Sequence, residues 1–122
     1  MPGRQRKIVL HLCLKGVHRS WTGARVFNEL FRIDHLDKEY HAEYAGVAPE
    51  AKRRVTQEQI DRAHSILAAD GLVMKFLRGY ERFDAKTVQL VIMETHETFR
   101  NSPHLRSVYK QVYAENGGFL WR

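Results

Sequence analysis

Cysteine is nearly absent from the sequence, since the 122 residues include only one, Cys13. A single cysteine excludes an internal disulfide framework, and it excludes any mechanism that needs a second, resolving cysteine in the same chain. Long apolar runs are also absent, because no stretch approaches the roughly 20 apolar residues of a membrane span. Residues 1–7 lead into a strand pattern rather than the apolar segment of a signal peptide. We therefore expect a soluble, cytoplasmic protein with no membrane partner.

Acidic residues are outnumbered, because 20 lysines and arginines face 14 acids and give a formal net charge of +6. This charge favours anionic partners. The aromatic residues do not alternate with the basic ones as a base-stacking surface requires, so nucleic acid is not the favoured anion. The seven histidines show no paired ligand spacing on a predicted helix. We therefore expect neither a metal nor another cofactor.

The length and composition fit one globular domain over residues 1–122, with 43% hydrophobic and 28% charged residues. Hydrophobic periodicity predicts strands over residues 8–12, 38–47, 65–69 and 87–93 and helices over 22–31, 57–63, 72–83 and 103–114. This alternation predicts a three-layer α/β fold, in which a four-stranded parallel sheet carries helices on both faces. Ligands bind such sheets beyond the carboxyl ends of the strands, so the loop after the first strand is the expected site.

The stretch from Cys13 to Ser20 carries the clearest chemical signal. Cys13 ends an apolar strand pattern, and Arg19 follows six residues later, close to a helix pattern. Backbone N–H groups converge at such a helix N-terminus, where they favour a bound phosphate and a thiolate. Arg19 adds a planar, permanently charged fork that matches a tetrahedral oxyanion, and the Ser20 hydroxyl can stabilise a thiolate. The alternative interpretation is a small, buried core cysteine.

The predicted phosphate-binding residues of this loop are Leu14, Lys15, Gly16, Val17, His18 and Arg19. Lys15 and His18 are the two whose side chains could tune the charge of the loop. Both side chains could equally face solvent, as loop residues usually do.

These features resemble the low-molecular-weight protein tyrosine phosphatase family. The family shows an apolar strand, a Cys-x5-Arg-Ser loop and a helix that opens Pro-Thr-Ala, and the first thirty residues match this pattern well. Weaker similarity continues at residues 44–47, where the family reads Ser-Ala-Gly-Thr, and through residues 53–67. The resemblance implies a phosphatase that hydrolyses a phosphomonoester, with phosphotyrosine one candidate. Cys13 would be the nucleophile that forms a cysteinyl-phosphate, Arg19 and the loop amides would hold the phosphoryl oxygens, and Ser20 would keep Cys13 ionised.

Trp21 departs from the family pattern, because it replaces the proline at the start of the helix. The indole can cap the pocket or pack in the core, and core packing is the favoured interpretation.

The general acid is the second departure. The family uses an aspartate followed by proline, whereas no Asp-Pro occurs in this chain and Ser102 precedes Pro103 in the corresponding segment. Loss of a general acid typically costs about 10²- to 10⁴-fold in rate. The candidate replacements are Glu94, His96, Glu97 and His104. Each can equally be a helix cap or a solvated residue. A second hypothesis is therefore a phosphate-binding or interaction module that keeps the loop without efficient turnover.

Overall fold

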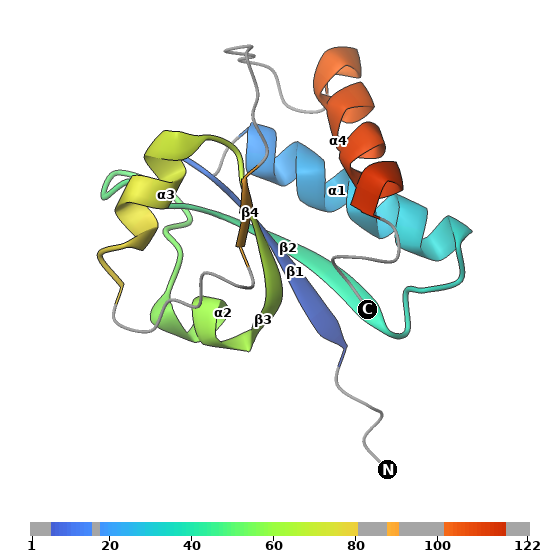
Figure 1. The fold of residues 1–122 in the computed structure, drawn as a ribbon, viewed down its shortest axis with the longest axis horizontal. Coiled ribbons are helices and arrows are strands. Elements are labelled where there is room, and N and C mark those ends of the chain that lie inside the picture. Colours follow the sequence, from blue (N-terminus) through green and yellow to red (C-terminus); the bar gives the residue numbers. More distant parts are fainter. Residues whose placement is uncertain (1–5, 16–17, 81–87, 91–101, 117–122) are drawn as a thin grey trace.

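The computed structural model describes residues 6–15, 18–80, 88–90 and 102–116 (Figure 1). The parallel strands are β1 (Lys7–Cys13), β2 (Tyr40–Gly46), β3 (Ala63–Ala68) and the three-residue β4 (Val88–Leu90). The helices are α1 (Arg19–Ile33), α2 (Gln57–Arg62), α3 (Gly71–Leu77) and α4 (Pro103–Asn116). The prediction of a parallel α/β sheet with helices is confirmed. Of the strand predicted over residues 87–93, only residues 88–90 lie in the described part of the chain.

The strand order is β2-β1-β3-β4. From β1 the chain runs first to β2 at one edge of the sheet, and it then crosses to the other side of β1 to form β3 and β4. Such a reversal leaves a crevice at the carboxyl ends of the two strands that flank it. Here those strands are β1 and β3, which lie side by side in parallel. The carboxyl end of β1, where Cys13 lies, is therefore the position that the topology favours for a ligand.

Side chains of β1 alternate between two hydrophobic layers, as a period of two requires. Val9 packs with residues of α1 and α4 on one face. Leu10 and Leu12 pack with residues of α2 and α3 on the other. The prediction that helices cover both faces of the sheet is therefore confirmed for the described residues.

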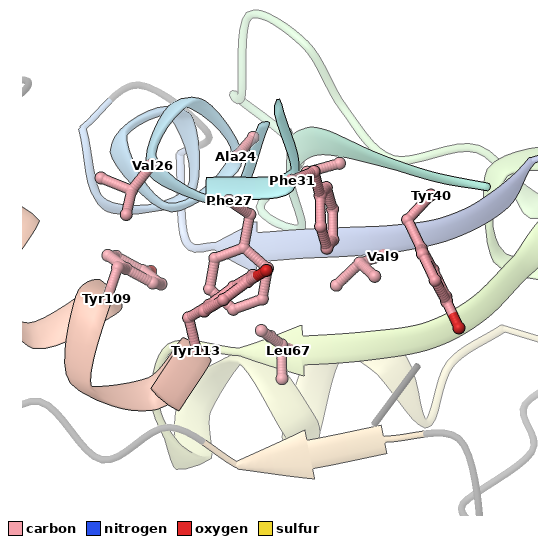
Figure 2. Packing of buried hydrophobic residues seen from close by; sticks show 10 residues of the cluster. Val9, Ala24, Val26, Phe27, Phe31, Tyr40, Leu67, Tyr109 and Tyr113 are labelled. Carbon is pink, nitrogen blue, oxygen red and sulfur yellow. The ribbon is translucent and has the colours of Figure 1, made fainter. Parts of the chain in front are cut away.

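Aromatic rings fix α1 and α4 to the sheet (Figure 2). The Phe27 and Tyr113 rings meet edge to face at 5.3 Å between centroids, and Phe31 lies 5.7 Å from Tyr113. The Tyr113 hydroxyl donates a 2.6 Å hydrogen bond to Asp34, just after α1. Each buried phenylalanine stabilises the fold by about 1.5–3 kcal/mol. This packing holds α1, and with it the residues that follow the loop, against β1.

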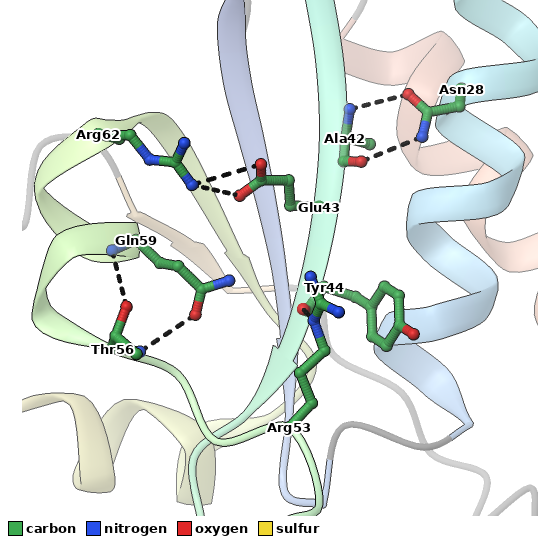
Figure 3. Close-up of polar contacts among 8 residues, drawn as sticks. All are labelled: Asn28, Ala42, Glu43, Tyr44, Arg53, Thr56, Gln59 and Arg62. Carbon is green, nitrogen blue, oxygen red and sulfur yellow. Dashed lines mark hydrogen bonds and ion pairs between the residues drawn. The ribbon is translucent and has the colours of Figure 1, made fainter.

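Local signals set the ends of α2 and α3. The Thr56 side chain accepts from the Gln59 amide and the Gln59 side chain accepts from the Thr56 amide, each at 3.1 Å, so α2 begins at the predicted residue 57 (Figure 3). The helix predicted over 72–83 is shorter in the structure, where α3 ends at Leu77. The prediction failed because the apolar spacing continues past this end through Tyr80, whose hydroxyl donates to the Val55 carbonyl over 2.8 Å.

Candidate functional site

Cys13 is the last residue of β1, and its side chain is buried, with 4% exposed. Its Sγ lies 3.2 Å from the Oγ of Ser20, at hydrogen-bond distance. Ser20 is fully buried in the first turn of α1. A buried hydroxyl beside a buried sulfur can donate its proton to a thiolate and so stabilise the ionised form. The structure therefore brings together two of the three predicted catalytic side chains.

The loop between β1 and α1 is tied to the end of β2 at its first residues. The Leu14 carbonyl accepts from the amides of Val47 at 3.0 Å and Ala48 at 2.9 Å. The Leu14 side chain is half-buried and Lys15 is exposed, so the solvent-facing interpretation of Lys15 is confirmed. The predicted binding residues Gly16 and Val17 lie outside the described residues.

His18 ends the loop immediately before α1. Its carbonyl accepts from the Thr22 amide at 3.0 Å and from the Thr22 hydroxyl at 2.7 Å, which anchors the first turn of the helix. The side chain is half-buried, and its Nδ1 is buried without a hydrogen-bond partner in the described part of the chain. The His18 side chain is therefore less exposed to solvent than the Lys15 side chain.

Arg19 pairs with a carboxylate that was not among the predicted site residues. Its guanidinium lies 3.0 Å from Oδ2 of Asp70, and the two side chains are 16% and 32% exposed. Asp70 follows β3, whose end is held beside β1 because the Ala69 amide donates to the Leu12 carbonyl over 2.9 Å. The other carboxylate oxygen of Asp70 accepts from the Val73 amide at 3.1 Å and caps α3. A carboxylate directly after a predicted strand was the signal available in the sequence.

A buried layer of polar rings lies beside Cys13. His11, two residues earlier on β1, is fully buried, and neither ring nitrogen has a hydrogen-bond partner among the described residues. Its ring meets Phe27 at 4.5 Å and Tyr109 at 5.5 Å, both edge to face. Burial lowers the pKa of His11 to about 3, so the imidazole is neutral at pH 7.

Tyr109 reaches this layer from α4 and is also buried. Burial raises its pKa well above the usual range, the charge of Cys13 raises it further, and Arg19 opposes the shift. The ring lies against the backbone of Gly23, where a Cβ would come 2.5 Å from Tyr109 and 2.6 Å from His11. Glycine is therefore required at this position of α1 for the rings to fit.

Trp21 does not pack in the core, contrary to the favoured interpretation. The indole is half-buried, and the Arg25 guanidinium lies 5.3 Å from its ring centroid. It lines a groove between α1 and β2. A hydrophobic pattern could not distinguish the core from this groove, because the indole lies along α1 in both cases.

Of the four predicted general-acid candidates, His104 lies in the described part of the chain. Glu94, His96 and Glu97 lie outside the part of the chain that the structure describes. His104 is exposed in the first turn of α4. Ser102 caps that helix, because its hydroxyl accepts from the Leu105 amide at 3.2 Å. The carboxylate of Asp70, which is described, contacts the predicted catalytic residue Arg19.

Two kinds of feature are missing from the described residues. No helix there is long and apolar enough to cross a membrane. No three histidine, cysteine, aspartate or glutamate side chains gather there as metal ligands.

Sequence comparison gives no relative, since no protein-family model matches the chain and no curated protein matches it significantly. Structural comparison gives many solved structures that are similar to this chain. A low-molecular-weight protein tyrosine phosphatase from Bacillus subtilis superimposes with a TM-score of 0.71 at 13% identity, over 92% of this chain and 98% of that one. The arginine phosphatase YwlE, with a phosphorylated active-site serine, gives 0.70 at 14% identity, over 92% and 97%. Wzb from Vibrio vulnificus, in complex with benzylphosphonate, gives 0.65 at 16% identity, over 93% and 96%.

These neighbours match nearly the whole chain, and the resemblance seen in the first thirty residues extends to the complete arrangement of strands and helices. At identities of 13% to 16% the likeness concerns the fold. The chain therefore has the fold of the low-molecular-weight protein tyrosine phosphatases.

Proposed function

We propose that the protein is a cysteine-dependent phosphatase that hydrolyses a phosphomonoester through a cysteinyl-phosphate on Cys13. The observation that supports this most is the 3.2 Å contact between the buried Cys13 sulfur and the Ser20 hydroxyl, at the carboxyl end of an inner strand. A core cysteine needs no such partner. Two structural neighbours hold a phosphorylated active-site serine and a benzylphosphonate, which supports a phosphoryl group as the ligand here.

In the first step, the Cys13 thiolate attacks phosphorus and the bond to the ester oxygen breaks. The electron pair leaves with that oxygen, which takes a proton. In the second step, water attacks phosphorus, the sulfur–phosphorus bond breaks, and the thiolate and inorganic phosphate are released. Arg19 and the amides of residues 14–19 would hold the equatorial oxygens, and Ser20 would stabilise the thiolate before and after each turnover.

Asp70 has two parts in this proposal. It orients the Arg19 guanidinium in the absence of an anion, and it competes with a phosphoryl oxygen for that guanidinium. The candidate proton donors to the leaving oxygen are Glu94, His96, Glu97 and His104. Geometry with a bound anion decides among these groups before pKa does.

A phosphate-binding module is the second candidate function, and the absence of an Asp-Pro pair in the sequence favours it. In that case Cys13, Arg19 and the loop bind inorganic phosphate or a phosphorylated partner without efficient turnover. The same fold and the same Cys13–Ser20 contact would serve either function.

Hydrolysis of an aryl phosphate, compared with phosphate or vanadate binding, separates the two candidates. The phosphatase proposal expects turnover that Cys13→Ser abolishes and Ser20→Ala reduces, because the thiol of the Ser20 variant ionises less readily. Alkylation of Cys13 at pH 7 should slow in Ser20→Ala for the same reason. Binding without turnover supports the phosphate-binding module. The absence of both binding and turnover would contradict both candidate functions.

A further inference from the structure

A groove of about 420 Å³ lies between α1 and the edge strand β2. The residues that line it from α1 are Trp21, Ala24, Arg25, Asn28, Glu29 and Arg32. Their spacings of three and four residues put them on one face of the helix. Arg53 lines the groove near β2, where its Nε donates to the Tyr44 carbonyl over 3.1 Å (Figure 3). The groove is therefore bordered by basic and aromatic side chains.

The acids of the groove are neutralised from outside it. Glu29 pairs with Arg106 of α4 at 2.8 Å. Glu43 pairs with Arg62 of α2 at 3.2 Å, and Figure 3 shows it turned toward that arginine, on the side of β2 away from α1. Neither carboxylate is therefore left to balance the positive charge inside the groove.

The arginines of the groove are exposed and form no ion pair within the described part of the chain. These are Arg25, Arg32 and Arg53. Two of them are held in place by aromatic rings, since Arg25 lies 5.3 Å from the Trp21 centroid and Arg53 lies 4.9 Å from that of Tyr44. Cations fixed in this way lose less conformational freedom when they bind an anion. The groove is thus suited to carboxylates.

The edge of β2 is closed to another strand. The Asn28 side chain donates to the Ala42 carbonyl at 3.0 Å and accepts from the Ala42 amide at 2.8 Å (Figure 3). The Tyr44 carbonyl is occupied by Arg53. A polypeptide in the groove would therefore be recognised through its side chains and not by strand addition. Nucleic acid is less favoured, because each aromatic ring already has a guanidinium over one face.

The groove begins beside the candidate catalytic loop. Trp21 is two residues after Arg19, and Tyr44 pairs in register with His11, two residues before Cys13. With a rise of about 1.5 Å per residue, Arg25 lies about 9 Å and Arg32 about 20 Å from Arg19 along α1. An extended chain advances about 3.3 Å per residue, so these distances equal about three and six residues.

We propose that this groove binds acidic side chains of a phosphorylated polypeptide substrate, about three and six residues from the phosphorylated position. The proposal rests on the phosphatase function proposed above and names the substrate class of the same site. Arg25 and Arg32 supply the specificity, while Cys13 and Arg19 act on the phosphoryl group.

The test compares two phosphopeptides, one with glutamates at the third and sixth positions from the phosphorylated residue and one with glutamines there. Each peptide is made in two versions, with the substituted positions either before or after the phosphorylated residue. The variants are R25Q/R32Q and the matched control K75Q/K110Q, which removes two exposed lysines of α3 and α4 and the same charge. An aryl phosphate, too small to reach the groove, reports on the catalytic loop alone.

The wild-type protein should prefer the acidic peptide by about fivefold in kcat/KM, since exposed ion pairs are individually weak. The preference should disappear in R25Q/R32Q, persist in K75Q/K110Q, and fall at 1 M salt, where the Debye length is about 3 Å. Activity on the aryl phosphate should be unchanged in both variants. A preference that both double variants reduce equally, or that R25Q/R32Q leaves intact, would overturn the proposal.

Failure of the proposed phosphatase function would give a different result from failure of the groove proposal. If the aryl phosphate is not hydrolysed, fluorescence anisotropy with the same peptides tests the groove by itself. Tighter binding of the acidic peptide, lost only in R25Q/R32Q, supports the groove even then. A single-stranded oligonucleotide that binds there when the acidic peptide does not would assign the groove to nucleic acid and contradict the proposal.

Discussion

Replacement of His11 by leucine should remove a pH-dependent loss of stability. Burial holds the pKa of His11 at about 3 in the folded protein, whereas an unfolded histidine titrates at 6.5. The unfolded chain therefore binds a proton that the folded protein does not between pH 6.5 and 3, and the free energy of unfolding falls as pH falls through that window. From pH 7 to pH 4.5 this costs about 2.5 kcal/mol, at 1.36 kcal/mol per unit.

Urea unfolding at several pH values measures this effect. At pH 7, His11→Leu should be at least as stable as the wild type, because it removes two buried ring nitrogens that have no partner among the described residues, each of which costs about 1–3 kcal/mol. At pH 4.5 the variant should be more stable than the wild type by a further 2.5 kcal/mol or so. His41, whose pKa is also lowered by burial, is present in both proteins and cancels. If the free energy of unfolding falls equally in the two proteins between pH 7 and pH 4.5, His11 is not the cause of the loss.

Three further substitutions test other parts of the structure. Gly23→Ala should destabilise the fold by about 2 kcal/mol in urea unfolding, because its Cβ would meet the Tyr109 ring at 2.5 Å; a stabilised variant would show that the ring moves freely. Asp70→Asn keeps a side-chain oxygen for the α3 cap and removes the charge that competes for Arg19, so phosphate should inhibit or bind about fivefold more tightly with little change in Tm. Thr56→Ala should cost about 1 kcal/mol through loss of the α2 cap, and no change would refute the capping box.

The elements that build the site were predictable because their signals are local. The apolar run before Cys13 predicted β1, and periodicity predicted the start of α2 at residue 57. The start of α1 was predicted at residue 22 but lies at Arg19, three residues earlier. The apolar pattern missed this turn because Arg19 and Ser20 are polar and serve the candidate site instead of the core. Hydrophobic periodicity finds a helix by its buried face, and a polar first turn lacks that face.

Contacts between distant segments were not predictable in the same way. Asp70 is 51 positions from Arg19 in the sequence, and only the pairing of β3 with β1 brings them together. The groove beside Trp21 likewise needs α1 and β2 side by side. His11 is buried with no hydrogen-bond partner in the part of the chain that the structure describes. This runs against the usual placement of polar groups, so no pattern in the sequence predicts it.

Trapping of the covalent intermediate shows whether Cys13 is the nucleophile. The protein is mixed with an aryl phosphate, quenched in acid, digested and analysed by mass spectrometry, with Cys13→Ser and Arg19→Lys as comparison variants. One phosphoryl group is expected on the Cys13 peptide of the wild type, released as inorganic phosphate on further incubation before quenching. Arg19→Lys should form it much more slowly, since lysine lacks the planar fork. Turnover without any phosphoryl group on Cys13, or turnover that persists in Cys13→Ser, would contradict the account.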